Sequence, residues 1–358
     1  MPHPFRRQGC GRHGYPPAMA VTLKVVAQRA GVSVPTASRV LSGSTYPVVD
    51  ELRERVLAAA KELDYVPNAQ AQGLLRGNTG TIGVLVGDVG DPYFSEIVNG
   101  IHERATAQNL LVTICHTERD PERELGYFRM LQAHRAHSVI IAGSGLSDEE
   151  YRKGIATRVT SFRAAGGHVV GIGTPVVEMD RVLVDNRGGG RLLGRYLAGL
   201  GHREVALISG PEALSSSRER YDGLKEAFDE VGARLIVHHG PPNRDEGYHA
   251  AGVLLRDHPG LTALIGSADQ MAMGALAQLR DRGRSVPGDV SVAGFNDIAV
   301  SRDLSPSLTT VRLPLREMGM GALDLALRPH AADGEAAIER RLGVELVVRE
   351  STGPARSS

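Results

Sequence analysis

Two short amphipathic segments joined by a glycine, within residues 22–41, constrain this chain more than any other stretch. The first segment carries apolar residues at helical spacing: Leu23, Val26, Ala27 and Ala30. This spacing predicts a short helix with one apolar face. Gly31 is predicted to end the helix, because glycine readily takes the left-handed conformation that a tight exit requires.

The second segment is predicted to be a helix with a polar outer face. Ser33 can cap its first turn, and Pro35 falls where a missing N–H costs nothing. Its buried side is predicted to hold Ala37, Val40 and Leu41, and its outer side Thr36, Ser38 and Arg39. Two short helices, a glycine turn and a polar second helix are typical of a helix-turn-helix, whose second helix fits the DNA major groove. A plain αα-hairpin with a solvated face is the alternative interpretation.

Charge is unevenly distributed along the 358 residues, a length that indicates two or three domains. The net charge is zero, yet residues 1–80 carry ten Lys and Arg against five Asp and Glu. The basic end contains the helix-turn-helix, as attraction to phosphates would require. This excess of positive charge is modest evidence for DNA binding, since Arg6, Arg7 and Arg12 lie in the first dozen residues, before the helix-turn-helix.

No segment predicts export or a membrane partner. No apolar run approaches the length of a membrane span, and the residues after Arg6 and Arg7 lack the apolar core of an export signal. Cys10 and Cys115 are too few for a disulfide framework, so we expect unpaired thiols in a reducing cytoplasm. The protein is therefore predicted to be cytoplasmic.

The segments on either side of the helix-turn-helix also carry sequence patterns that predict their structure. We call the helix-turn-helix and the predicted helix that follows it the headpiece. Residues 1–20 are rich in Gly, Pro and Arg and are expected to be a disordered tail, with Met19 as a second candidate start. Asp50 is predicted to cap a third helix over residues 51–65. Its apolar side is predicted to comprise Leu52, Val56, Leu57, Ala60 and Leu63. Asn68 can cap a short helix to Leu75, a segment too short to be stable alone.

From Thr81 onward, apolar runs alternate with amphipathic helical segments, and the series starts again at RVLVDN. Such alternation predicts parallel sheets covered on both faces. The fold class is therefore predicted to be α/β: an all-α helix-turn-helix headpiece plus two doubly wound parallel-sheet lobes, like those of periplasmic binding proteins. A ligand site is expected between the lobes, at the carboxyl ends of the strands.

These patterns divide the chain into six predicted parts. They are a tail (1–20), the headpiece (21–66), a hinge helix or linker (67–79), lobe 1 (80–180 with 308–335), lobe 2 (181–307 with 336–352) and a final tail (353–358). The strand and helix after residue 308 are assigned to lobe 1, which makes the chain cross between the lobes several times.

Motifs for catalysis, cofactors and metals are missing. The sequence has no G-x-x-x-x-G-K-[ST] loop, no G-x-S-x-G elbow and no H-E-x-x-H pair. The histidines near residues 134–137 and 238–239 lack acidic or cysteine neighbours that would suggest a metal site. We therefore expect no cofactor, no metal site and no enzymatic activity.

The chain resembles the LacI/GalR (lactose-repressor) family of bacterial transcription regulators over roughly residues 21–352. The matching strings are TLKVVAQRAGVSVPTASRV, ERVLAAAKELDYVPN, PNAxAxxL, DPYF, VDNRGGGRL and VAGFND before SPSLTTV. The resemblance implies a repressor that acts as a homodimer on a near-palindromic operator in double-stranded DNA, controlled by a small molecule such as a sugar, nucleobase or other metabolite. The family's tetramers use a terminal leucine heptad, which this sequence lacks, so a dimer is expected.

The resemblance also implies which residues contact DNA. Base contacts would come from Val34, Pro35 and Arg39, with Arg39 reading a guanine. Backbone contacts would come from Thr22, Ser33, Thr36 and Ser38. In the hinge, Asn68 and Ala71 would lie near the minor groove, and Leu74 would insert between base pairs and kink the duplex.

The implied effector residues are Tyr93 and Phe94 from lobe 1 and Ser216, Arg220 and Asn296 from lobe 2. Arg220 would be the main anchor for an anion or hydroxyl. Asn296 and Gly173 replace acidic residues that are frequent in the family, and Ala268 replaces an asparagine. A sugar held by several carboxylates and a stacking ring is therefore not favoured.

Two other functional classes share part of this pattern. A transport-type solute-binding protein has the two lobes but would need an export signal and no headpiece. An α/β enzyme would need clustered carboxylates, histidines or a phosphate loop in the cleft. Sequence-specific DNA binding that is lost on deletion of residues 1–80 distinguishes the regulator from both.

Overall fold

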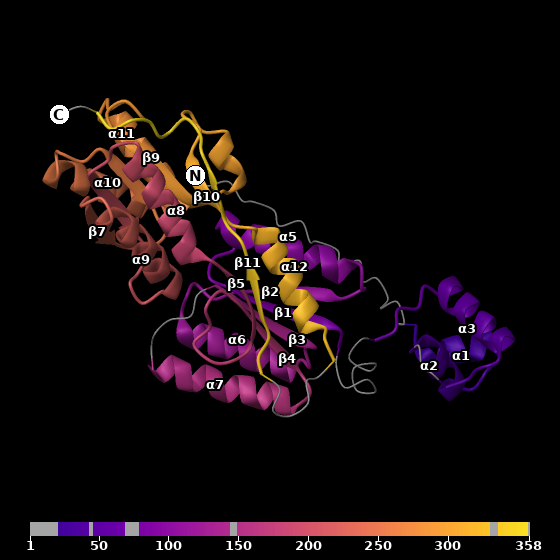
Figure 1. The fold of residues 1–358 in the computed structure, drawn as a ribbon. Helices are drawn as coiled ribbons and strands as arrows, with labels where there is room; N and C mark the ends of the chain where they lie inside the picture. Colours follow the sequence, from indigo (N-terminus) through magenta and orange to yellow (C-terminus); the bar gives the residue numbers. More distant parts are fainter. Residues whose placement is uncertain (1–20, 43–45, 69–78, 144–148, 330–335, 357–358) are drawn as a thin grey trace, which may run out of the picture. The chain divides into compact units, whose positions relative to one another are not determined.

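The computed structural model describes residues 21–42, 46–68, 79–143, 149–329 and 336–356 (Figure 1). They belong to two compact units, Met1–Arg76 and Gly77–Ser358. The first unit is helical and the second contains two six-stranded sheets, which confirms the predicted fold class. None of the described helices is long and apolar enough to cross a bilayer.

Three helices form the headpiece: α1 (Leu23–Ala30), α2 (Val34–Leu41) and α3 (Asp50–Glu62). Their apolar faces meet in a small core made of Val26, Ala27, Ala30, Ala37, Val40, Val56, Ala59 and Ala60. Alanines predominate, so the helices can approach closely without leaving voids.

Lobe 1 is a sheet with strand order β11-β5-β4-β3-β1-β2. Its strands are β1 (Thr81–Val86), β2 (Leu111–His116), β3 (Ser138–Ala142), β4 (His168–Ile172), β5 (Asp180–Val184) and β11 (Glu339–Leu342). Helices α5 (Pro92–Thr106) and α12 (Leu315–Ala326) cover one face, and α6 (Pro121–Ala133) and α7 (Glu149–Ala164) cover the other (Figure 1).

The alternating direction of the side chains along β1 explains why helices cover both faces of the sheet. Ile82, Val84 and Val86 belong to the cluster that includes α5 and α12, whereas Leu85 belongs to the cluster under α6 and α7. Successive strand residues point to opposite faces, so a continuous apolar run needs a helix layer on each side.

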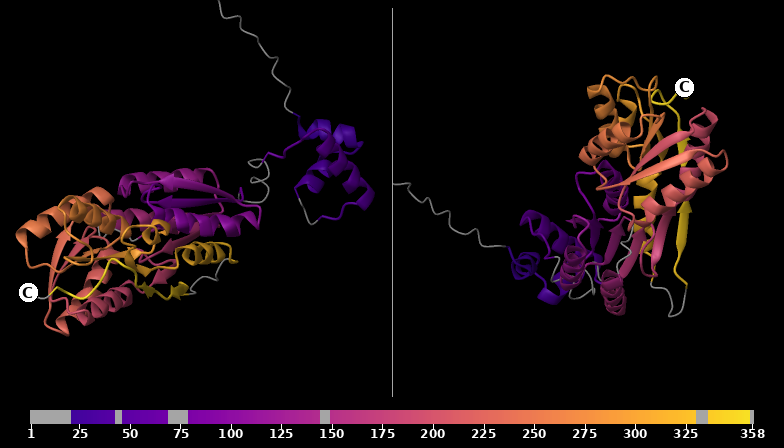
Figure 2. Two further views of the ribbon diagram at one scale, coloured as in Figure 1. Left: turned by 90° about the horizontal axis from the view of Figure 1, so that it is seen from above. Right: turned by 90° about the vertical axis from the view of Figure 1, so that its left-hand side faces the viewer.

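Lobe 2 repeats this design with strand order β12-β10-β9-β8-β6-β7. Its strands are β6 (Glu204–Ser209), β7 (Arg234–His239), β8 (Ala263–Gly266), β9 (Ser291–Asn296), β10 (Thr309–Arg312) and β12 (Glu345–Val347). Its helices are α8 (Asn186–Gly199) and α9 (Ser215–Asp229) on one face, and α10 (Arg244–Asp257) and α11 (Asp269–Asp281) on the other. Figure 2 shows both lobes from two further sides.

The predicted lobe boundaries are wrong at three strands. β5 pairs with β4 in lobe 1, although RVLVDN was expected to begin lobe 2. β10 pairs with β9 in lobe 2, although residues from 308 were assigned to lobe 1. β11 pairs with β5 in lobe 1, although residues 336–352 were assigned to lobe 2, whereas β12 pairs with β10 in lobe 2 as assigned. Strand pairing is a long-range choice that the alternating pattern does not encode.

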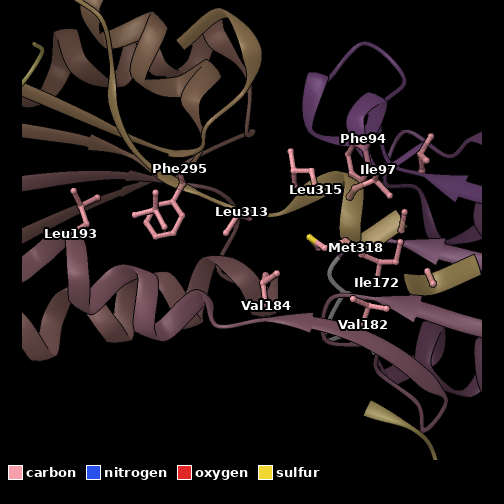
Figure 3. Packing of buried hydrophobic residues seen from close by; sticks show 14 of the residues in the cluster. Phe94, Ile97, Ile172, Val182, Val184, Leu193, Phe295, Leu313, Leu315 and Met318 are labelled. Atoms are coloured by element: carbon pink, nitrogen blue, oxygen red, sulfur yellow. The ribbon is translucent and has the colours of Figure 1, made fainter. Parts of the chain in front are cut away.

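The chain therefore crosses between the lobes after β5, after β10 and after β11. Buried side chains line this region in one continuous cluster. In Figure 3, Leu193 and Phe295 lie in lobe 2, Leu313 lies on the second crossing, and Leu315 and Met318 lie on α12 in lobe 1. The crossings are thus packed segments that join the two cores.

The final residues are also bound to lobe 2, in contrast to the expected tail at 353–358. The Gly353 carbonyl accepts hydrogen bonds from His202 Nε2 at 3.1 Å and Ser291 Oγ at 3.2 Å, and the Ala355 amide donates to the Leu200 carbonyl at 2.9 Å. Of residues 353–358, the structure leaves only 357–358 undescribed. The predicted tail at residues 1–20 lies wholly outside the described residues.

Candidate functional site

The helix-turn-helix has the local structure that its sequence predicts. Gly31 ends α1 with φ 66°, in the left-handed region. Ser33 caps α2, because its hydroxyl accepts a hydrogen bond from the Thr36 amide at 3.3 Å. Pro35 lies in the first turn of α2. Each of these signals depends on residues within one or two helical turns, so none of them requires contacts with distant parts of the chain.

The outer face of α2 carries the predicted DNA-reading residues. Val34 is 41% exposed, Pro35 and Arg39 are exposed, and Thr36 and Ser38 are partly buried. The Arg39 guanidinium lies over the ring of Tyr46, 4.3 Å from its centre. A cation–π contact of this kind attracts the guanidinium to the face of the ring. Tyr46 was not predicted, since nothing local links it to α2.

The other predicted DNA contacts lie around this face or outside the described residues. Thr22 and Ser33 are exposed at the starts of α1 and α2, and Asn68 is exposed after α3. Ala71, Leu74 and the expected hinge helix fall within residues 69–78, outside the described part.

Two expectations for the third helix are wrong. Asp50 is the first residue of α3 and not its cap, because the capping position falls at Val49, which has no side-chain oxygen. Leu57 is 49% exposed instead of lining the core. The core-facing stripe is carried by Val56, Ala59 and Ala60, and residue 57 lies next to it on the outer side.

One cavity collects all five predicted effector residues. Tyr93 and Phe94 come from the start of α5, Ser216 and Arg220 from α9, and Asn296 from the end of β9. The residues that line it come from both lobes and include Asp91, Arg119, Gly143, Gly210, Leu214, Ser217, Pro242, Ser267 and Ala268. It lies at the carboxyl ends of the strands, where open α/β sheets bind ligands.

Arg220 is held rigidly and is nearly inaccessible from outside, at 7% exposure. Its Nε donates to Asn186 Oδ1 at 2.9 Å, and its Nη1 donates to the Ser267 carbonyl at 2.5 Å. Its guanidinium stacks 4.5 Å from the centre of the Phe295 ring. Among the described residues it makes no ion pair, so an anionic group in the cavity could pair with it directly.

Asn296 presents an unpaired acceptor to the same cavity. Its side chain is buried, and its Oδ1 has no hydrogen-bond partner among the described residues. The next residue, Asp297, is fixed by Arg312 and Arg349, each with an N–O distance of 2.7 Å. Buried acceptors without a partner are rare in folded proteins, so Asn296 is suited to a ligand N–H or O–H.

Sequence reasoning missed Asp91 and Arg119. Asp91 caps α5, with Oδ1 accepting from the Tyr93 amide at 3.0 Å, and burial raises the pKa of its carboxyl. Arg119 follows β2, and its guanidinium lies 5.4 Å from the centre of the Phe94 ring. Both follow the carboxyl end of a strand, and that position is the signal that could have found them.

Helix α9 positions Arg220 through unusually close contact with α8. A Cβ on Gly223 would lie 1.9 Å from the Arg187 carbonyl oxygen, and a Cβ on Gly190 would lie 2.4 Å from the Arg220 carbonyl oxygen. Only glycine allows the two backbones to meet at these points.

We expect Gly223→Ala to destabilise lobe 2 by about 1–3 kcal/mol, because α8 and α9 must separate. Urea unfolding followed by circular dichroism measures the change. Gly199→Ala is the matched control, since a Cβ on Gly199 of α8 meets nothing within 4 Å. Equal stability of the two variants would contradict the close-contact explanation.

Comparison with known proteins places these features in a family. The profile of the lacI family of bacterial regulatory proteins matches residues 22–68, and a periplasmic binding protein-like domain matches residues 195–352. The ribose operon repressor of Halalkalibacterium halodurans is 30% identical over 345 residues, covering 94% of this chain and 98% of that protein. The chain belongs to the lacI family.

Further similarities extend over nearly the whole regulator. The transcriptional repressor PurR of Haemophilus influenzae is 31% identical over 338 residues, which cover 92% of this chain and 98% of PurR. The lac repressor dimer, solved bound to operator and the anti-inducer ONPF, is 28% identical with a TM-score of 0.81 and covers 93% of this chain and 99% of its own.

Membership settles the functional class of this lacI-family protein. It is a DNA-binding transcription regulator with a small-molecule-binding domain, and its relatives are regulators rather than enzymes. The predicted function is confirmed at this level, and the enzyme and transport alternatives are not supported.

Proposed function

We propose that this lacI-family regulator is a cytoplasmic homodimeric repressor that binds a near-palindromic operator and responds to a small molecule in the cleft. The observation that carries the proposal is the pairing, in one chain, of an exposed Arg39 face with a cavity that unites Arg220 and Asn296. The lac repressor relative, solved as a dimer on its operator, supports the dimer and the DNA partner.

On DNA, α2 would enter the major groove with Val34, Pro35 and Arg39 toward the base edges. The two-fold symmetry of a dimer would place a second α2 one helical turn away, which is why the operator should be near-palindromic. Thr22, Ser33, Thr36 and Ser38 would contact the backbone and set the position of α2.

In the cleft, the effector would bridge the two lobes. Tyr93 and Phe94 lie on one side, while Ser216, Arg220 and Asn296 lie on the other. A ligand that binds both sides favours one relative placement of the lobes. We propose that this change separates the paired hinges, withdraws Leu74 and lowers operator affinity. A corepressor bound in the cleft would instead raise operator affinity.

Selection of genomic DNA fragments by the purified full-length chain tests the proposal. We expect enrichment of a near-palindromic site, a dimer mass by light scattering, and loss of selection when residues 1–80 are deleted. A monomer that enriches no sequence, with or without added metabolites, would overturn it.

A separate prediction concerns the hinge. Leu74→Ala should reduce both operator affinity and DNA bending, because a smaller side chain cannot wedge between base pairs. Circular-permutation gel shifts measure the bend angle and affinity together. Val66→Ala is the control, since Val66 is 79% exposed just after α3. An unchanged bend angle for Leu74→Ala would argue against intercalation.

A further inference from the structure

The cleft contains a second guanidinium that has no carboxylate at ion-pair distance among the described residues. Arg119 lines the same cavity as Arg220 but comes from lobe 1. Among the described residues Arg119 makes no ion pair, while its neighbour Glu118 pairs with Arg123 at 2.6 Å. The cavity is thus lined by one arginine from each lobe, and neither is engaged by a carboxylate.

The backbone around Arg119 fixes its position. Arg119 has φ 59°, and its amide donates to Thr117 Oγ1 at 3.3 Å. Thr117 is buried and its hydroxyl donates to the Val86 carbonyl at 3.1 Å. A Cβ on Gly87 would lie 3.0 Å from Arg119 Cγ, so glycine leaves room for this side chain beside Phe94. The arginine is built into the wall of the cavity.

The charges and hydrogen-bonding groups of the cavity define a ligand class. Two arginines and one carboxylate, Asp91, line it, which leaves one positive charge if all three are ionised. Asn296 Oδ1 is a buried acceptor that needs an N–H or O–H donor. Ser216 and Ser217 add hydroxyls from lobe 2. A ligand that complements this set carries one negative charge together with hydroxyl groups.

We propose that the effector is a small polyhydroxylated carboxylate whose anionic group lies between Arg119 and Arg220. Its hydroxyls would donate to Asn296 and Asp91. Carboxylate is favoured over a phosphate monoester because a phosphate carries about −1.5 to −2 at neutral pH, more than the cavity's excess charge. This inference rests on the proposed effector role of the cleft and adds the charge of the ligand and the role of Arg119.

Matched ligands test the class on the full-length protein. Thermal unfolding is measured with hexonates and hexuronates, with the alditols and aldoses of the same carbon skeletons, and with hexose 6-phosphates, all at equal ionic strength. We expect a concentration-dependent rise in Tm with at least one carboxylate and none with its neutral counterpart. A rise with the neutral or phosphorylated compounds alone, or with none of the panel, overturns the inference.

Variants then assign the role of Arg119. We expect Arg119→Gln to weaken binding of the active carboxylate at least about tenfold, the usual effect of removing a charged hydrogen-bonding partner. Arg119→Lys should recover part of the affinity, because it keeps the charge but loses the bidentate geometry. Arg129→Gln, at an exposed position on α6, is the matched control and should bind as the wild type. Unchanged affinity in Arg119→Gln would exclude Arg119 from the site.

The two proposals fail in different ways. If a neutral sugar binds the cleft and changes operator affinity, the regulator function stands and only the anionic class is lost. If operator selection itself fails, the thermal shifts still report which compounds the lobes bind.

Discussion

Arg39→Ala should abolish the preference of this regulator for its operator while leaving weak, salt-sensitive binding to any duplex. A bidentate arginine–guanine pair contributes about 1–3 kcal/mol of discrimination. A dimer would use two such pairs, so specific affinity should fall by roughly thirty-fold to twenty-thousand-fold. The remaining binding comes from phosphate contacts, which carry no sequence information.

Competition gel shifts with operator and scrambled duplexes measure this effect over a salt series. Arg29→Ala is the matched control, because Arg29 lies on α1 and pairs with Glu62 on α3 at 2.5 Å, with both side chains 55% exposed. An exposed pair adds little stability, so this variant should keep the operator preference. A preserved ratio of operator to scrambled affinity in Arg39→Ala would show that another residue reads the site.

Asp269→Ala should destabilise the lobes by about 3–5 kcal/mol. Asp269 is completely buried at the start of α11 and accepts three hydrogen bonds. The donors are the Thr310 hydroxyl at 2.5 Å, the Ile298 amide at 2.8 Å and the Ser301 hydroxyl at 3.0 Å. Alanine leaves all three without a partner, and each unsatisfied buried donor costs about 1–3 kcal/mol. Removal of the buried carboxyl, which is itself costly to desolvate, offsets part of this loss. The loop after β9 would loosen, and with it Asn296.

Urea unfolding measures this loss, with Asp303→Ala as the control at a nearby exposed aspartate. The control should stay within about 0.5 kcal/mol of the wild type. A similarly small loss in Asp269→Ala would mean that water replaces the carboxylate and that the three bonds do not hold the loop.

The same residue predicts a pH dependence. Burial raises the pKa of Asp269 to about 7 in the folded protein, against an ordinary value of 3.8. A raised pKa means that the folded state binds the proton more tightly, so this contribution to stability is present at low pH and is lost as the pH rises toward 7. The stability of the wild type relative to Asp269→Asn should therefore fall by roughly 2 kcal/mol from pH 5 to pH 7. A constant difference would contradict the raised pKa.

Local signals predicted much of the headpiece and part of the cleft. The Gly31 exit, the Ser33 cap and the apolar faces of α1 and α2 each depend on residues within one or two turns, and the structure has all of them. The assignment of Asp50 as a cap failed because a one-residue shift in the helix start moves the capping position to Val49. Local chemistry thus predicts that a helix forms more reliably than it predicts the residue at which the helix begins.

In the cleft, sequence-based prediction was limited by contacts between distant residues. Arg220 and Tyr93 were identified through the family resemblance, and the structure brings them into one cavity. Asp91 and Arg119 were missed although each follows the carboxyl end of a strand, because the neighbours that share the cavity with them, such as Arg220 and Ser267, lie more than a hundred residues away. A half-buried arginine after a strand looks the same in sequence as one on the surface.

The amino-acid sequence by itself determined that this chain would build a DNA-reading headpiece and two layered α/β lobes, because helix caps, glycine exits and apolar periodicity act over short distances. The tertiary structure alone decided which lobe receives β5, β10, β11 and β12, and which charges meet in the cleft. Those outcomes depend on competition between distant strands for the same sheet edges and on burial that only the complete packing creates.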